Sequence, residues 1–219
     1  MNEPHDSDDF QKFLSLDEEK RERIINAAMK EFLVGYKKGS TDVIVREAGI
    51  SKGLLFHYFG TKERLYRFII EHAINVMQTE FLNLINVSQP DILESVWQMS
   101  LLKRDLSVRY PELFDFLAIS FIDYKSRDNP WNENLKRLFD FRNKVMGDIY
   151  IKADKSLLRD DIDKQMAMNI INWAMTGYSQ SKITDAQTDN FGAETRENYD
   201  AYLTEFQDIL AILRKCFYK

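Results

Sequence analysis

Apolar residues recur at helical spacing along most of the chain, and polar residues or glycines interrupt the pattern at short intervals near its start. Ile24, Ala28 and Phe32 lie four residues apart and form one apolar stripe, which predicts an amphipathic helix that ends at about Leu33. The serine and glutamate of segment 15–18 have the spacing of a capping box, so this helix is expected to begin there. Residues 1–14 are mostly polar and acidic and are expected to form a flexible arm.

Three further helices are predicted in quick succession, because each stop signal is followed by a new start signal. They are expected over 41–48, over 52–59 and from 62 to about 84. Gly49 and Gly60 are expected to end the first two, since glycine tolerates the left-handed backbone conformation found at helix C-termini. A hydroxyl residue is the expected N-cap of each helix, in chain order Ser40, Ser51 and Thr61.

Longer amphipathic helices are predicted after Pro90, and no segment alternates convincingly between apolar and polar residues as a half-exposed strand would. The expected spans are 91–106, 111–126, 131–153, 162–182 and 196–217. The polar stretch 185–198 contains a glycine and is expected to be a loop. The predicted fold class is therefore all-α.

Composition excludes several classes of protein. The chain has 219 residues, of which 44% are hydrophobic, enough to bury a core. Cys216 is the single cysteine and the three histidines are scattered, so neither a disulfide nor a metal site is expected. The sequence contains no Gly-rich phosphate loop, nucleophile elbow or HExxH motif, so we expect no catalytic residues, no cofactor and no enzyme activity.

The chain is expected to lie in the cytoplasm. No apolar run approaches the roughly 18 residues of a membrane-spanning helix. The acidic start of the sequence is unlike the basic start of a signal peptide.

Charge is distributed unevenly, and this changes how the overall net charge of −5 is interpreted. Residues 1–19 carry a net charge of −6, residues 20–67 carry +6, and residues 68–219 carry −5. A basic segment inside an acidic chain fits a local anionic partner such as nucleic acid. Chance variation on a charged helical surface would explain the same distribution, so charge alone leaves both interpretations open.

Segment 40–59 has the pattern of a helix-turn-helix, in which two short helices are joined by a turn containing glycine. Leu55 and Phe59 are four residues apart in the second helix and are expected to face inward together. They are expected to pack on the apolar residues of the first helix and the turn, Ile44, Ala48 and Ile50.

The outer face of the second helix suits nucleic acid. It is expected to carry Lys52, Gly53, Leu54, Phe56, His57 and Tyr58. Lysine can pair with phosphate, glycine allows close backbone approach, and apolar side chains can contact thymine methyl groups. Free amides at the capped helix starts, together with Lys62, add sites for anions. The alternative for Phe56 and Tyr58 is that both are ordinary core aromatics, and for His57 that it is an ordinary surface histidine.

Residues 20 to about 70 resemble the DNA-binding domain of the tetracycline-repressor-like (TetR) family. The resemblance rests on four stretches in register: Ile25-x-Ala27-Ala28-x-x-x-Phe32, Ile44 to Gly49, Gly49-Ile50-Ser51-Lys52-Gly53-x-Leu55-x-His57-Tyr58-Phe59 and Thr61-Lys62-Glu63-x-Leu65. It implies a recognition helix at 52–58 and phosphate contacts from Thr41, Ser51, Tyr58 and Lys62. Leu54 and Phe56 depart from the family pattern, since a polar residue and a tyrosine are common there. Both changes remove a hydroxyl and make apolar contacts the expectation.

The resemblance further implies an all-helical homodimer that represses transcription and leaves DNA when a small ligand binds. The expected organisation is an arm at 1–14, a three-helix DNA-binding domain at 15–66 and a helical ligand-binding and dimerisation domain at 67–219. Two helices that are apolar most of the way round are the expected dimer interface. The interface residues are expected to be Met166, Ile170, Trp173, Gly177, Tyr202, Phe206, Ile209 and Leu213. Internal core is the alternative for both stripes.

Aromatic and polar side chains on the central helices are the candidates for an effector pocket. The expected lining is Trp97, Phe114, Phe121, Tyr124, Trp131, Phe139, Arg142, Met146, Asn172, Trp173 and Tyr178. The expected partners are thus double-stranded DNA, a small organic effector and a second copy of the chain. Two alternatives remain open: an activator of the same fold, and a helical protein-interaction module without sequence-specific DNA binding.

Overall fold

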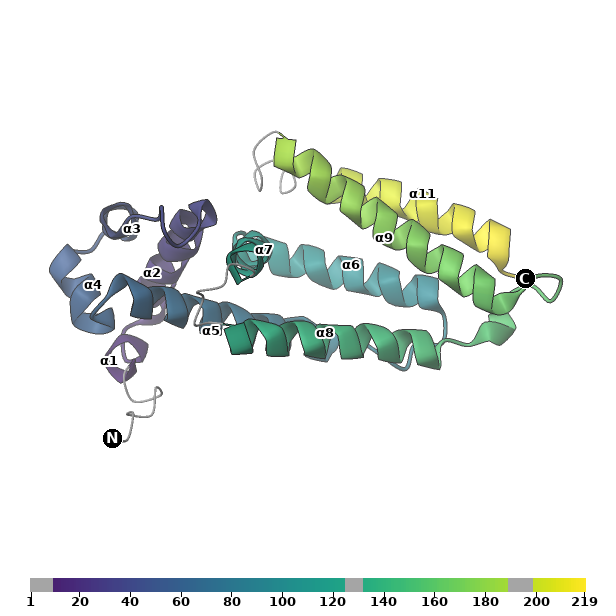
Figure 1. Cartoon of the computed structure of the whole chain (residues 1–219), viewed down its shortest axis with the longest axis horizontal. Helices are drawn as coiled ribbons and strands as arrows, with labels where there is room; N and C mark the ends of the chain where they lie inside the picture. Colours follow the sequence, from purple (N-terminus) through teal and green to yellow (C-terminus); the bar gives the residue numbers. More distant parts are fainter. Residues whose placement is uncertain (1–9, 125–131, 189–198) are drawn as a thin grey trace. The chain divides into compact units, whose positions relative to one another are not determined.

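A computed structural model of the chain describes residues 10–124, 132–188 and 199–219. Every regular element within these ranges is a helix, apart from an isolated β-bridge between Leu158 and Tyr218, which agrees with the predicted all-α class. The α-helices are α1 (Gln11–Leu14), α2 (Glu18–Glu31), α3 (Thr41–Ala48), α4 (Lys52–Phe59), α5 (Lys62–Glu80), α6 (Ile92–Arg109), α7 (Leu113–Tyr124), α8 (Asn132–Lys152), α9 (Lys164–Thr188) and α11 (Tyr199–Phe217), coloured along the chain in Figure 1. Short 3-10 helices lie at Phe32–Val34, Leu82–Leu84 and Lys155–Leu157.

The described residues form two compact units. The first contains residues up to 78 together with 112–138, and the second contains 79–111 together with residues from 139 onward. No helix in the described ranges combines the length and apolar character needed to cross a membrane.

In the first unit, α2 packs on α3, and α7 contacts both α2 and the 3-10 helix that follows it. The core is densely aromatic. Tyr66 is fully buried and packs edge-on against Phe32 and Phe116, while its hydroxyl shares a 3.2 Å hydrogen bond with Ser120. Gly39 is needed for close packing here, because a Cβ atom at this position would lie 2.7 Å from the Phe32 ring.

The N-terminal segment differs from its prediction in two ways. Residues 11–14 form α1 rather than a flexible arm, because Phe13 is completely buried; residues 1–9 of the expected arm lie outside the described ranges. The predicted capping box at 15–18 is also wrong. Asp17 is the N-cap of α2 and accepts a hydrogen bond from Lys20 N, whereas the Ser15 hydroxyl donates back to Lys12 O at the end of α1.

In the second unit, α6 packs on α11, and α9 lies alongside α11 (Figure 1), where Tyr178 stacks on Tyr202 with ring centroids 5.6 Å apart. One polar cluster joins the end of α11 to the start of α6. Asp91 caps α6 by accepting from Leu93 N, and it also accepts hydrogen bonds from Arg214 at 2.6 Å and from the Tyr218 hydroxyl at 2.7 Å. Burial alone would raise the pKa of the Asp91 carboxyl, but these hydrogen bonds outweigh it and lower the pKa.

Candidate nucleic-acid interface

The two short helices α3 and α4 begin and end where the capping and glycine signals predict. Gly49 joins them at φ 66° and ψ 38°, in the left-handed region that glycine adopts most readily. Leu55 and Phe59 are almost completely buried, as are Ile44 and Ala48 of α3, so these four residues face inward as predicted, and α3 contacts α4. Ile50, the predicted packing residue of the turn, is only half-buried.

The outer face of α4 contains both exposed and half-buried residues. Lys52, Gly53 and His57 are exposed. The remaining predicted members of this face, Leu54, Phe56 and Tyr58, are half-buried. A Cβ atom added at Gly53 would meet no other heavy atom within 4 Å, so packing inside the protein does not require a glycine there.

The helix starts near this face are capped in two different ways. Ser51 Oγ accepts from Leu54 N at 3.1 Å, and Thr61 Oγ1 accepts from Arg64 N at 3.1 Å, as expected of N-caps. Ser40 occupies the N-cap position of α3 but its side chain accepts no capping hydrogen bond; its backbone N–H instead donates to Glu31 Oε1 at 2.8 Å. The predicted side-chain cap at Ser40 is therefore wrong. Thr41 follows it as the first, half-buried residue of α3.

Lys62 is held in place at the start of α5 by residues from the preceding turn. Its ammonium group donates to Lys37 O at 3.3 Å and lies 4.9 Å from the centre of the Tyr36 ring. Sequence reasoning missed Tyr36. In the sequence, Tyr36 and two lysines directly follow Gly35, and this short aromatic and basic stretch could have indicated a site for an anion. In the structure, Gly35 forms the turn before it, with a φ of 87°.

Lys52, the other lysine predicted to pair with phosphate, already has an acidic neighbour. Its ammonium group lies 2.7 Å from an Asp42 carboxylate oxygen, and both side chains are more than half exposed. Such exposed ion pairs contribute only about 0–1 kcal/mol, so phosphate can displace the carboxylate at little cost. Asp42 thus holds Lys52 near the turn but does not prevent Lys52 from pairing with another anion.

The predicted effector residues are spread over both units. Phe114, Phe121 and Tyr124 lie on α7 in the first unit, and Trp97 and the described candidates from Phe139 onward lie in the second. The half-buried members are Trp97, Phe114, Phe139, Met146 and Tyr178, and the exposed members are Arg142, Asn172 and Trp173. Trp131 and the side chains of Phe121 and Tyr124 lie outside what the structure describes.

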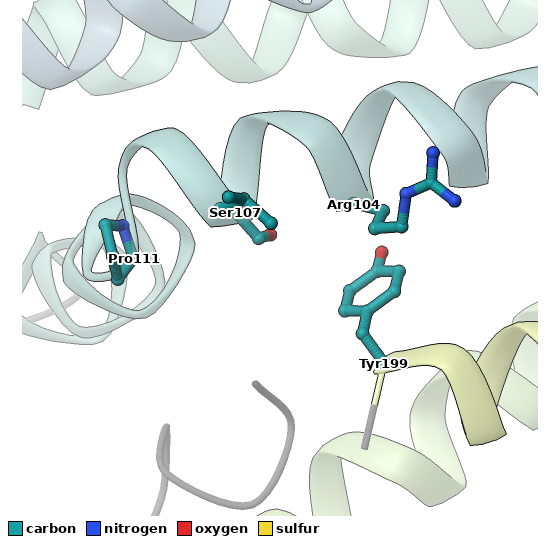
Figure 2. A pocket seen from close by; sticks show the side chains of 5 residues that line it. Arg104, Ser107, Pro111 and Tyr199 are labelled. Atoms are coloured by element: carbon teal, nitrogen blue, oxygen red, sulfur yellow. The ribbon is translucent and has the colours of Figure 1, made fainter. Parts of the chain in front are cut away.

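A pocket of about 220 Å³ lies in the second unit between the end of α6 and the start of α11 (Figure 2). Its described lining is Arg104, Ser107, Val108, Pro111 and Tyr199, and none of these was predicted. The Tyr199 hydroxyl is buried and has no hydrogen-bond partner among the described residues. Burial raises the pKa of this phenol above its ordinary value, so the group stays protonated and can donate a hydrogen bond.

The predicted dimer residues divide by helix. On α9, Met166 is 49% exposed, Ile170 37% and Trp173 61%, and Gly177 is also exposed. On α11, Phe206 and Leu213 are buried inside the chain, while Tyr202 and Ile209 are half-buried. Phe206 and Leu213 therefore have little surface left for a partner, and the internal-core alternative describes these two residues better.

Comparisons with known proteins agree on both the short helices and the whole fold. Residues 24–68 match the family described as bacterial regulatory proteins, tetR family. A TetR family transcriptional regulator from Chloroflexus aurantiacus has 19% identity and a TM-score of 0.62, with 95% of this chain and 98% of that chain covered. Ketosteroid transcriptional regulator KstR2 of Mycobacterium tuberculosis has 15% identity and a TM-score of 0.62, with 94% and 97% covered. MbdR regulator from Azoarcus sp. has 16% identity and a TM-score of 0.56, with 84% and 96% covered. Curated protein sequences give no match.

Proposed function

We propose that the chain is a DNA-binding transcriptional regulator of the tetR family of bacterial regulatory proteins, and that it is a repressor that binds a pseudo-palindromic operator as a homodimer and leaves it when a small organic effector binds. Proteins of this family are transcription factors and not enzymes. We place its action in the cytoplasm, where bacterial DNA is accessible.

The observation that carries the proposal is the outer face of α4. Leu55 and Phe59 are buried and anchor this helix in the core, while Lys52 and His57 are exposed to solvent. A helix of this size enters the major groove of B-DNA, where side chains can reach base edges. The net charge of +6 on residues 20–67 supplies the attraction for the phosphate backbone.

The exposed apolar face of α9 supports the homodimer. Met166, Ile170 and Trp173 are large hydrophobic side chains that all remain open to solvent in the single chain. A clustered apolar surface of this kind marks an interface. Twofold symmetry would present two α4 helices to two half-sites, about 34–36 Å apart or a multiple of that spacing.

The pocket between α6 and α11 supports the effector. Its lining combines apolar surface with a few polar groups, among them the buried Tyr199 hydroxyl, as small-molecule sites do. An effector acts only if its affinity differs between the DNA-bound and the released state. We therefore propose that effector binding favours a dimer in which the two recognition helices no longer match the half-site spacing.

Equilibrium binding of the purified protein to a labelled duplex of mixed sequence, measured over a series of salt concentrations, tests DNA binding. We expect the logarithm of the binding constant to fall linearly with the logarithm of salt concentration, because each neutralised phosphate releases counterions. Binding that stays near background at low salt, by a protein that is folded, would contradict the proposal and favour a protein-interaction module.

Replacing Lys62 with alanine is expected to weaken binding to all duplexes by a similar factor, about two- to fivefold, and to reduce the salt slope by about one. The reason is the position of its ammonium group, held at the start of α5 by Lys37 O and Tyr36. Anisotropy titrations with two unrelated duplexes measure the effect, and Lys144→Ala, an exposed lysine of α8, is the matched control. Weakening confined to one duplex sequence would contradict the phosphate role.

A further inference from the structure

We propose that α1 contributes to DNA binding by holding the recognition helix α4 in position. Phe13 of α1 is the positioning residue for α4. This inference rests on the proposed function. It concerns a helix that lies outside residues 24–68, the segment that matches the family model.

Helix α1 and its N-cap residue contact the last turn of α4. Phe59, the buried anchor of that turn, packs against Phe13 with ring centroids 4.8 Å apart and against Phe10 at 5.9 Å. Phe68 of α5 completes this aromatic cluster at 5.4 Å from Phe59. Of the three described ring partners of Phe59, Phe13 therefore lies in α1 and Phe10 is the N-cap residue of α1.

Helix α1 also contacts a residue of the outer face of α4. The Phe13 ring meets the Tyr58 ring edge-on at 5.8 Å, and Tyr58 in turn contacts His57 at 5.5 Å. Phe13 itself is completely buried, so its ring has one position against which Tyr58 rests. A chain of ring contacts thus leads from α1 to the two side chains that end the recognition face.

Contacts with α2 and α5 hold α1 in place. Arg21 of α2 donates to Leu14 O at 2.8 Å and to Leu16 O at 3.3 Å, which satisfies carbonyl groups at the end of α1. Phe10 also contacts Phe68 at 4.9 Å, and the Arg64 guanidinium lies 5.8 Å from the Phe10 ring. Because α2, α4 and α5 all contact α1, it links the recognition helix to the rest of the unit.

The physical reason that α4 needs such support is its length. A helix of eight residues is unstable by itself in water, so packing must hold its position and its last turn. Removing the Phe13 ring would leave space beside Phe59 and Tyr58 into which both can rotate. We expect the helix to remain in the folded protein but to lose the orientation that sequence-specific contacts require.

The test compares Phe13→Ala with Phe116→Ala, the matched loss of a fully buried ring in α7 that packs on Tyr66 instead of α4. Both variants should lower the unfolding temperature. Anisotropy titrations, run well below that temperature, use the palindromic duplex selected by the unaltered protein and a mixed-sequence duplex of the same length. Phe13→Ala should weaken binding to the selected duplex about tenfold and to the mixed duplex about twofold, while Phe116→Ala changes neither by more than about twofold.

If the Phe13→Ala protein does not fold, Phe13→Leu and Phe116→Leu are compared instead, because leucine removes less side-chain volume than alanine. Equal affinities of the two variants for the selected duplex would overturn the positioning role and leave α1 as ordinary core. The proposed function fails separately, because in that case the unaltered protein binds neither duplex.

Discussion

Replacing Trp173 with aspartate is expected to convert the proposed dimer to a monomer and to weaken operator binding by about a hundredfold or more. Trp173 is 61% exposed on α9, between Ile170 and the exposed Gly177. An indole at the centre of an interface contributes much of its stability, and a buried carboxylate without a partner opposes association strongly. A monomer presents only one recognition helix and so loses one half-site.

Analytical ultracentrifugation measures the oligomeric state, and anisotropy measures operator affinity at the same protein concentrations. Ile151→Asp is the control, because Ile151 is 82% exposed on α8 and also apolar but is not part of the proposed face. We expect Ile151→Asp to remain dimeric. A Trp173→Asp protein that stays dimeric and keeps its affinity would show that α9 is not the interface.

Replacing Gly53 with alanine is expected to weaken operator binding about tenfold or more while leaving the protein at least as stable. A Cβ atom at Gly53 meets nothing within 4 Å inside the protein, and alanine favours a helix by up to about 1 kcal/mol over glycine. In the proposed complex the added methyl group would instead face the DNA, at the start of the recognition helix, where glycine would allow the backbone to approach closely.

Chemical denaturation gives the free energy of unfolding, and anisotropy gives the affinity for the selected duplex. Gly147→Ala is the matched control, because a Cβ atom there also meets nothing within 4 Å and Gly147 lies within α8, in the second unit. We expect Gly147→Ala to be equally tolerated in folding and to bind DNA normally. If the Gly53→Ala variant bound the selected duplex with unchanged affinity, the first turn of α4 would not lie close to the DNA.

The bounds of α3 and α4 could be predicted because their start and stop signals are local. Ser51 caps α4 through its own hydroxyl, and Gly49 and Gly60 adopt positive φ at the two helix ends. These signals act within three or four residues, so they do not depend on the rest of the fold.

Helix α1 could not be predicted in the same way. Its four residues are too few to be stable alone, and Phe13 is buried by Tyr58, Phe59 and Phe68, more than 40 residues away in the sequence. The same limit applies to the pocket, since Arg104 and Tyr199 come together only through the packing of α6 on α11. Tyr36 was missed because its contact with Lys62 arises from a turn with no regular pattern.

Selection of duplexes from a random DNA pool by the purified protein, followed by sequencing, tests the central claim most directly. We predict that a palindromic motif is enriched, with two half-sites separated by about one helical turn or a multiple of it. Failure to enrich any motif, by protein shown to be folded and dimeric, would contradict a sequence-specific regulator.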